Sequence, residues 1–524
     1  MQARYPAGIA FAISLSALSL NAEAARYHLG GMELQVDTTL SAGVSFRAED
    51  ADPALIGIAN GGTGRSVNGD DGNYGYEAWD VVSTAIKATV DADFRFGRNS
   101  GIFTRGSAFY NPEASGAGQL EERLAANDGA GASRPRGQRE LGSRGHDRLD
   151  HELELLDAFY YGRFSVGERS LSVTAGNQVV SWGESTFIRN GINILNPIDV
   201  AKFRLPGSQI REALTSIPML LVSLPLTTNL SVEALWQADW DRIEIDPRGS
   251  FFATSDIASD DGDNVVVSFG RRQDDNSRPI KDPRTDPDAG GDPENGDAQV
   301  WVPREADRRP DDELSQAGMS LRYYASWLNS TEFGLYYVNY HSRAPLLSAV
   351  RGESTNALNG AAPLCSSDAS EGCRASYFVE YPEDISLWGL SFNTNGPFGT
   401  AVQGEVSYRS NQPVQISGAE VLMPTLGVPG TILGSFAPGE TVTGFERANT
   451  TQVQATITKA FGPAFGASQW VALGEIGYTH QDLSDTPFSG PGADLPSCRT
   501  AQGLGPETQA QVLAAVSNGS CQEN

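Results

Sequence analysis

The sequence of 524 residues has only four cysteines and five histidines, and no apolar run beyond its N-terminus is long enough for a membrane-spanning helix. Four cysteines cannot form a disulfide scaffold in a chain of this length, and a transmembrane helix needs about 18 apolar residues. Basic residues are also scarce: 38 Lys and Arg stand against 65 Asp and Glu, which gives a formal net charge of −27. Such a surface repels nucleic-acid phosphates. These features exclude a nucleic-acid partner, a zinc protein and a helical transporter.

Residues 1–24 have the pattern of a signal peptide. Arg4 supplies the positive charge, residues 7–20 form a short apolar run, and Ala22-Glu23-Ala24 matches the small-residue cleavage signal. The run is too short to cross a bilayer as a helix. A buried N-terminal helix is the alternative interpretation. We expect an exported protein whose mature chain begins near Ala25.

The remaining chain repeatedly alternates apolar and polar residues. From 82 to 96, the even positions are mostly apolar, while the odd positions include Lys87, Asp91 and Asp93. A period of two places these sets on opposite faces of a strand. The pattern recurs at 230–241, where Leu235 is an exception, and at 401–409 and 451–459. We predict about thirteen strands, near 34–47, 81–96, 101–110, 152–165, 171–182, 217–226, 230–241, 316–324, 332–341, 384–393, 401–409, 451–460 and 469–479.

Three features favour a transmembrane barrel over a secreted β-sandwich or solenoid, because a soluble sandwich alternates as well. Aromatic residues lie near the ends of the apolar faces, as in the interfacial girdles of membrane barrels; they are Phe94, Phe96, Trp236, Trp240 and Tyr408. Long polar connections alternate with short ones, which is typical of outer-membrane barrels. The signal peptide supplies the compartment. We predict an all-β fold, a large antiparallel transmembrane β-barrel in the outer membrane.

The C-terminal region does not continue the strand pattern. Residues 480–524 show no alternation and are predicted to be irregular. A strand edge in lipid leaves backbone groups unpaired, and bacterial barrels usually have an even number of strands. We therefore expect residues 25–479 to form an incomplete barrel, with roughly 16 or more strands in the complete protein. The alternative is a natural soluble tail after an unrecognised last strand.

The segment 183–216, between two predicted strands, is irregular and rich in Gly, Asn and charged residues. The stretch Ser208–Leu214 is long enough for a short helix that Ser208 can cap. Two interpretations remain open: a constriction inside the lumen, or an outer loop packed on itself. In a pore, charged side chains set selectivity. The candidates for the lumen or a constriction are Lys87, Asp91, Asp93, Arg95, Glu184, Arg189, Asp199, Lys202, Arg204, Arg211, Glu212, Glu233 and Asp239.

Nothing in the sequence indicates a catalytic, cofactor or metal site. Residues 183–187 (GESTF) begin like a nucleophile elbow but lack its closing glycine, so we expect no enzyme. Acidic groups at 70–73 and 260–264 are rich in oxygen ligands, but neither matches an EF-hand loop; solvated acidic loops are the simpler interpretation. Cys365 and Cys373 lie in one predicted outer loop, where an exported compartment favours a structural disulfide.

Three blocks carry a resemblance to a known family. Residues 176–224 read GNQVVSWGESTFIRNGINILNPIDVAKFRLPGSQIREALTSIPMLLVSL, residues 235–247 read LWQADWDRIEIDP, and residues 155–161 read LLDAFYY. These closely resemble domain-of-unknown-function family 1302, whose members are large Gram-negative outer-membrane proteins with a signal peptide and a predicted β-barrel. Members typically continue well past the point where this chain stops.

The resemblance also implies partners and a cargo. Genes of this family often lie beside a periplasmic family with a lipoprotein-carrier-like shape and an inner-membrane exporter of the RND type. This implies trafficking of an apolar or lipid-like substance across the outer envelope, in contact with outer-membrane lipid. We expect a transport barrel for such a molecule. A general hydrophilic diffusion porin and a structural or adhesive surface barrel are the alternatives.

Overall fold

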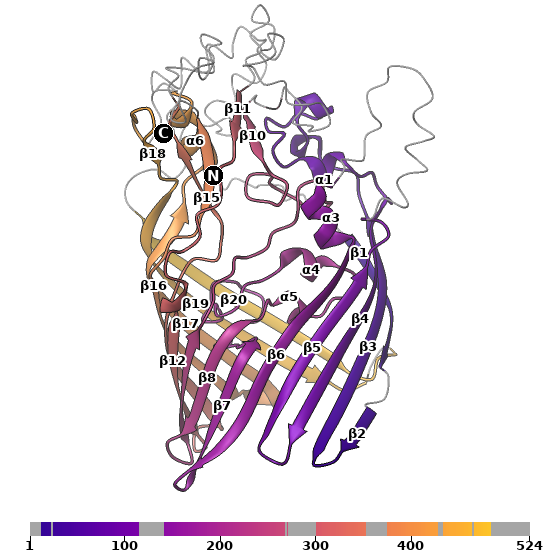
Figure 1. Cartoon of the computed structure of the whole chain (residues 1–524), viewed down its shortest axis with the longest axis vertical. Helices are drawn as coiled ribbons and strands as arrows, with labels where there is room; N and C mark the ends of the chain where they lie inside the picture. Colours follow the sequence, from indigo (N-terminus) through magenta and orange to yellow (C-terminus); the bar gives the residue numbers. More distant parts are fainter. Residues whose placement is uncertain are drawn as a thin grey trace, which may run out of the picture.

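A computed structural model describes residues 12–21, 25–114, 141–267, 270, 300–352, 375–427, 433–463 and 466–483. Its main element is an antiparallel fifteen-stranded sheet that curves into a barrel (Figure 1). The strands follow one another in sequence order around the sheet. They are β1 (Ala12–Asn21), β2 (Ala25–Leu29), β3 (Met32–Arg47), β4 (Val81–Phe96), β5 (Ser100–Tyr110), β6 (His151–Val166), β7 (Arg169–Gln178), β8 (Ile217–Pro225), β9 (Leu230–Gln237), β12 (Ala317–Ala325), β13 (Thr331–Tyr340), β16 (Ile385–Asn395), β17 (Thr400–Gln415), β19 (Phe445–Phe461) and β20 (Trp470–Asp482).

Every strand predicted from alternation is confirmed, and most boundaries differ by only a few residues. Strand β1 lies within the predicted signal peptide and pairs with β3. The predicted cleavage signal at 22–24 lies outside the described residues, as do residues 1–11, so the cleavage site stays a prediction. Among the described residues no pairing joins the edge strands β1 and β20. The irregular tail was predicted to begin at residue 480, but β20 continues to Asp482. The rest of that tail lies outside the described residues from 484 onward.

The two faces of the sheet differ in chemistry. On β4, Ile86 and Val90 are 65% and 40% exposed, whereas Lys87 and Thr89 are 6% and 3% exposed. The apolar set therefore points outward and the polar set points into the barrel, as the alternation predicts. Other strands carry the same outward band, which includes Leu153, Leu155, Trp388, Leu390, Val453, Ile457, Ile476 and Tyr478. An antiparallel barrel with an apolar exterior belongs in the Gram-negative outer membrane.

The connections at the two ends of the barrel are unequal. At one end, turns of a few residues join successive strands, as between β4 and β5 and between β6 and β7. At the other end, long loops fold into a layer that we call the cap (Figure 1). By the usual asymmetry of outer-membrane barrels the cap lies outside the cell. Within the described residues, no helix has the length and apolar content needed to cross a bilayer.

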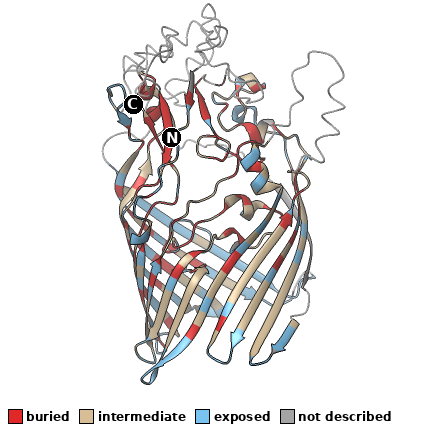
Figure 2. Ribbon diagram, in the orientation of Figure 1, coloured by how far each residue is buried: buried red, intermediate tan, exposed pale blue. Residues whose placement is uncertain are grey.

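The cap has its own hydrophobic core. It contains the two-stranded sheet β10–β11, the three-stranded sheet β15–β14–β18 and the helix α6. Buried residues such as Val302, Tyr377 and Val421 form this core, which Figure 2 shows as red ribbon above the barrel. The bounds of these cap elements are β10 (Asn264–Val267), β11 (Val300–Pro303), β14 (Leu346–Val350), β15 (Ser376–Glu380), β18 (Thr441–Val442) and α6 (Gly418–Thr425). The other helices of the described residues are α1 (Asp71–Tyr74), α3 (Ser143–Leu149), α4 (Val200–Arg204) and α5 (Ile210–Ala213), with short 3-10 helices at Pro53–Leu55, Ile58–Asn60, Glu313–Ser315 and Pro397–Gly399.

Two strands end several residues earlier than predicted. Strand β7 ends at Gln178, where the chain turns away from the sheet, rather than at residue 182. Strand β9 ends at Gln237 rather than continuing to residue 241. Trp240 is therefore not part of an interfacial girdle: it is 1% exposed and packs against Tyr381 in the cap, with ring centroids 4.8 Å apart. The alternation in the sequence thus continues past the end of the strand, where Trp240 instead joins a buried cluster with Val379 and Tyr381.

Arginine–carboxylate pairs stabilise the cap. Asp260 accepts hydrogen bonds from Arg148 (2.8 Å) and Arg242 (3.0 Å), and Arg148 also lies 3.1 Å from Asp199, below the cap. Burial alone would raise the pKa of Asp260, but the two guanidinium groups outweigh it and leave this pKa lowered. The stabilisation from Asp260 is thus present above its ordinary pKa near 3.8 and is lost as pH falls through the lowered value.

We predict that Asp260→Asn loosens the cap and leaves the barrel folded. A hydrogen bond between charged groups contributes about 2 kcal/mol, so amide protection in α3 and residues 241–263 should fall about 30-fold at neutral pH. Hydrogen exchange followed by mass spectrometry measures this change. The difference from wild type should shrink as pH falls below the Asp260 pKa. Equal loss of protection in β4 would contradict a local role.

Candidate functional site

The connection between β7 and β8, residues 179–216, does not fold outward. We call it the lumen segment, because its helices α4 and α5 lie inside the barrel (Figure 1). Its contacts reach the inner faces of strands on opposite sides: Glu212 contacts Lys87 on β4, and the backbone near Glu184 contacts Glu405 on β17. The sequence left two interpretations open, a segment inside the lumen and an outer loop packed on itself. In the structure the segment lies inside the barrel. It fills the interior between the walls.

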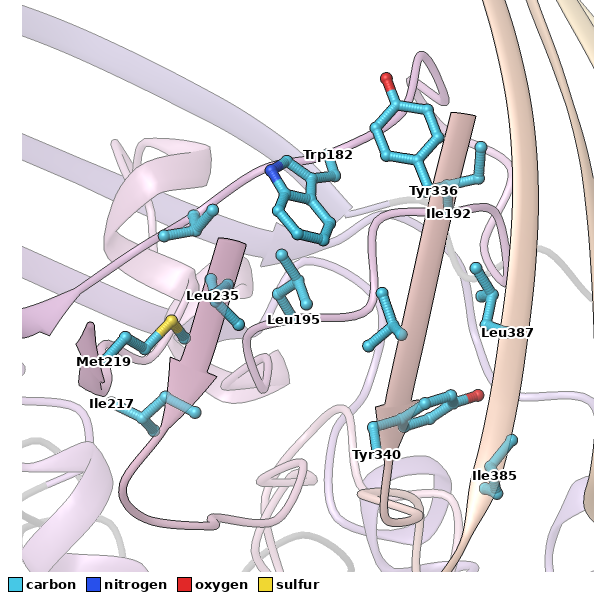
Figure 3. Close-up of a cluster of buried hydrophobic side chains, with 12 residues drawn as sticks. Trp182, Ile192, Leu195, Ile217, Met219, Leu235, Tyr336, Tyr340, Ile385 and Leu387 are labelled. Carbon is cyan, nitrogen blue, oxygen red and sulfur yellow. The ribbon is translucent and has the colours of Figure 1, made fainter. Parts of the chain in front are cut away.

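An apolar cluster attaches one side of the lumen segment to the wall. Val180, Trp182, Ile192 and Leu195 are buried against inward-facing residues of β8, β9, β13 and β16. The wall residues in this cluster are Ile217, Met219, Leu235, Tyr336, Val338, Tyr340, Ile385 and Leu387. Figure 3 shows Trp182, Leu195 and Leu235 gathered between these strands. The break in alternation at Leu235 is thus explained, because this inward position packs on Trp182 instead of meeting water.

Two wall carboxylates hold the backbone on the opposite side. Glu405 is 3% exposed and accepts hydrogen bonds from the amides of Glu184 (2.6 Å), Ser185 (3.2 Å) and Ile192 (2.8 Å). Glu475 on β20 accepts from the next three amides, those of residues 186–188, at 2.7–2.9 Å. A carboxylate that receives several N–H donors is strongly stabilised in its charged form. These bonds replace secondary structure for a stretch that forms no helix or strand.

The carbonyl groups of the same stretch are bound as well. Arg409, which is 2% exposed, donates to the carbonyls of Asn190 (2.6 Å) and Gly191, and Gln452 donates to the carbonyl of Arg189 at 2.8 Å. Gly191 is required here, because a Cβ at this position would come within 2.0 Å of Glu405 Oε1. The wall of β17, β19 and β20 thus binds donors and acceptors of residues 184–192.

Charged pairs attach the third side of the segment. Lys87 on β4 forms a buried ion pair with Glu212 and also donates to the carbonyl of Gly207 at 3.3 Å. Thr89 donates to the other oxygen of Glu212 at 2.8 Å. Helix α5 begins at a capping box between Gln209 and Glu212, so Gln209, rather than Ser208, is its cap residue. Glu212 is accordingly both an anchor and part of the helix start.

Other predicted charges lie in the same network. Asp91 accepts two hydrogen bonds from Arg105, at 2.8 and 2.9 Å, and lies 3.7 Å from Arg211. Lys202 on α4 pairs with Glu152 (3.0 Å) and Glu154 of β6. Asp199 caps α4 by accepting the amide of Lys202 at 2.9 Å. These side chains are neutralised by one another.

The remaining candidates are more scattered. Glu233 accepts from the Trp182 indole at 3.0 Å, and Glu184 accepts from the Asn393 side chain at 3.0 Å. Asp93 binds Arg95 and the Tyr161 hydroxyl, each at 2.7 Å, near the short-turn end.

Three candidates lie away from this network. Arg204 reaches the cap by pairing with Asp246, and Arg189 has an exposed side chain. Asp239 lies past the end of β9, where it accepts the amide of Trp240 at 2.8 Å. Cys365 and Cys373 lie outside the described residues, so their disulfide stays a prediction.

Sequence reasoning missed the wall residues that bind the backbone, Glu405, Arg409 and Glu475. Glu405 and Arg409 were recognised as the polar face of a strand, but a polar lumen face is expected in any barrel. A signal for two of them is present in the sequence. Glu405 and Arg409 are large charged residues spaced four apart on one inward face, where both are buried, opposite a stretch that contains Gly183 and Gly191.

The acidic loops do not gather ligands for a metal in the part of the chain that the structure describes. Asp260 is bound by Arg148 and Arg242, while Asp261 and Asp263 are bound by Arg144. Across the described residues, no group of three or more His, Cys, Asp or Glu side chains has an arrangement suited to a metal ion.

We predict that Glu405→Gln and Glu475→Gln release different parts of the lumen segment. An uncharged amide forms weaker hydrogen bonds than a carboxylate, by about 1–2 kcal/mol. Exchange of the amides of residues 184, 185 and 192 should accelerate about tenfold in Glu405→Gln, and that of residues 186–188 in Glu475→Gln. Ser407→Ala, on the same inward face as Glu405, is the control. Unchanged exchange in both variants would show that the two carboxylates are not needed to hold this backbone.

Solved structures that are similar at low identity include Salmonella typhi OmpF in complex with daunomycin (9% identity, 87% of this chain and 100% of that chain covered, TM-score 0.24), the ferric enterobactin receptor PfeA of Pseudomonas aeruginosa in a mutant form (10%, 86% and 52%, 0.29) and OprB of Pseudomonas putida (10%, 86% and 94%, 0.23). No curated protein matches the sequence. The family model described as "Protein of unknown function (DUF1302)" matches residues 5–519. Because this match covers nearly the whole chain, the protein belongs to the DUF1302 family.

Proposed function

We propose that this outer-membrane barrel passes a hydrophobic or lipid-like molecule, and that the lumen segment closes the route in the conformation described here. The observation that carries the proposal is the apolar inner wall of β8, β9, β13 and β16. Inward-facing Met219, Leu235 and Leu387 are buried only because Trp182, Ile192 and Leu195 cover them. A cargo that replaces this cover must itself be apolar, since exposing the wall to water costs roughly 25 cal/mol per Å².

A general hydrophilic porin fits this interior less well. Porins keep a polar, water-filled channel, and their lumen charges remain available to solutes. Here Lys87, Asp91 and Glu212 are engaged in ion pairs within the barrel, and the lumen segment lies between the walls.

A structural or adhesive surface barrel is the second candidate. The ordered cap favours it, because a loop layer with its own core resembles a domain that presents a fixed surface. In that case the lumen segment would serve as permanent filling. The two candidates therefore differ in whether residues 179–216 ever leave the wall.

The proposed partners follow from the family resemblance and from chemistry. An apolar molecule needs a carrier through the aqueous periplasm and an energy source at the inner membrane. A lipoprotein-carrier-like periplasmic protein and an RND-type exporter would supply them. We propose no catalytic role for the barrel, and the charged side chains in its interior act as structural anchors.

We predict that the wild-type protein is electrically silent in a planar bilayer and that Glu405→Gln/Glu475→Gln shows brief openings, because the double variant loses both carboxylate anchors. The same variant should bind a pyrene-labelled fatty acid more strongly than wild type does. Adding Leu235→Gln to the double variant should weaken this binding about tenfold, since it places an amide on the apolar wall. Single-channel recording and fluorescence titration are the measurements.

Each contrary outcome has a clear meaning. Large, steady, ohmic channels in wild type would replace the proposal with a general diffusion pore. Silence and absence of probe binding in every folded variant would favour the structural barrel. Ser407→Ala, on the same inward face as Glu405, is the matched control and should behave as wild type.

A further inference from the structure

The barrel wall is uneven in height on one side. Strand β6 runs from His151 to Val166, but its pairing with β7 extends only from Ala158 to Val166. At Gln178 the chain leaves β7 and enters the lumen, and β8 begins opposite it at Ile217. In the part of the chain that the structure describes, residues 151–157 of β6 thus have a strand partner on their β5 edge alone.

This unpaired stretch has a lipid-facing side. Leu153 and Leu155 point outward and are 86% and 59% exposed, and they pair with Ala108 and Gly106 of β5, within the apolar outer band. Backbone groups without partners are costly at membrane depth unless protein covers them or they line a cavity. Among the described residues, what completes the wall here is not a strand.

The lumen segment supplies the cover. Ser216, just before β8, donates its hydroxyl to the carbonyl of Leu156, and Lys202 of α4 pairs with Glu152 and Glu154. Figure 1 shows α4 and α5 beyond the ends of β7 and β8, beside the longer β6. Behind these contacts is a cavity of about 20 Å³, lined by residues such as Phe109, Leu156 and Leu205. This is room for about one water molecule, so any larger occupant requires α4 to move.

The route along the barrel axis is obstructed further up. The cap adds a packed hydrophobic core, and Arg148 and Arg204 tie it to the lumen segment through Asp199 and Asp246. An axial exit requires disruption of both layers. An exit through the side wall leaves the cap core in place, but it requires the displacement of α4 and Ser216 from β6 and the loss of the contacts that Asp199 and Arg204 make with the cap.

We propose that the side opening between β6 and β8, closed here by α4, is where the acyl chain of an amphiphilic cargo passes between the barrel interior and the outer leaflet. The inference rests on the proposed function and specifies its route. The apolar inner wall begins at this opening with Ile217 and Met219 of β8. An acyl chain would therefore remain in contact with apolar side chains from the lumen to the lipid.

The test is fluorescence quenching from the lipid phase. In a full-length background with the four cysteines changed to Ser, a bimane label is placed at Phe203→Cys on α4, whose native side chain is 54% exposed. The protein is reconstituted in vesicles of phosphatidylcholine brominated at mid-chain. Leu153→Cys, on the outer face, is the lipid-facing reference. Tyr324→Cys is the control, because it lies on the inward side of β12, which is paired on both sides.

We expect quenching at Phe203 close to that at Leu153 and well above that at Tyr324. Lys202→Gln, which removes the ion pairs to β6, should increase quenching at Phe203, while Arg95→Gln, which removes an exposed pair far from the opening, should not. The heat-dependent electrophoretic shift of folded barrels establishes that each variant is folded.

Three results would overturn the inference. Absence of quenching at Phe203 in both wild type and Lys202→Gln would exclude a side opening; if the fatty-acid binding above still held, the proposed function would stand with an axial route. Equal quenching at Phe203 and Tyr324 would show that lipid reaches the interior elsewhere. Quenching at Phe203 without any fatty-acid binding would refute both the cargo and its route.

Discussion

The hydrogen bonds from residues 184–192 to Glu405 and Glu475 are the constraint on which the interior depends. A polypeptide segment inside a barrel must pair its N–H and C=O groups, and this stretch forms neither helix nor strand. The wall therefore supplies the partners that secondary structure would otherwise provide. Because a carboxylate accepts several donors at once, two side chains on β17 and β20 hold an irregular backbone in one conformation.

The inner wall divides into regions of different chemistry, and this division orients the lumen segment. Strands β17, β19 and β20 bind its backbone through Glu405, Gln452 and Glu475. Strands β4 and β6 bind its charged side chains, chiefly Lys202 and Glu212. Strands β8, β9, β13 and β16 offer mainly apolar contact, to which Glu233 and Asn393 add single hydrogen bonds. A segment that rotated within the lumen would bring buried charges against the apolar wall, at a cost of several kcal/mol per unpaired charge.

The strands and their inward faces were predictable from sequence because both follow from a local period of two. The charge alternation around Lys87 and Asp91 has the register found in the structure, and the exception at Leu235 marks its contact with Trp182. The position of the lumen segment was not predictable, because it depends on contacts such as Glu184–Glu405, 221 residues apart. Local pattern also failed at Trp240, which continues the alternation past the end of β9 but is buried against Tyr381 in the cap. Ser208 was a reasonable helix cap by residue type, but Lys87 contacts its hydroxyl at 3.3 Å and Gln209 caps α5 instead.

The two kinds of attachment respond differently to an apolar cargo. An acyl chain that covers Met219 and Leu235 buries the same wall area that Trp182 and Leu195 bury, so the exchange costs little in hydrophobic free energy. An acyl chain has no acceptor for the amides that Glu405 and Glu475 bind, so those bonds have no substitute. A cargo would thus separate the segment from β8 and β13 while it stays attached to β17 and β20 through its backbone and to β4 and β6 through Glu212 and Lys202. On the side of the barrel where β7 and β8 are short, α4 and Ser216 contact β6 among the described residues, so passage there also requires that the Lys202 ion pairs break.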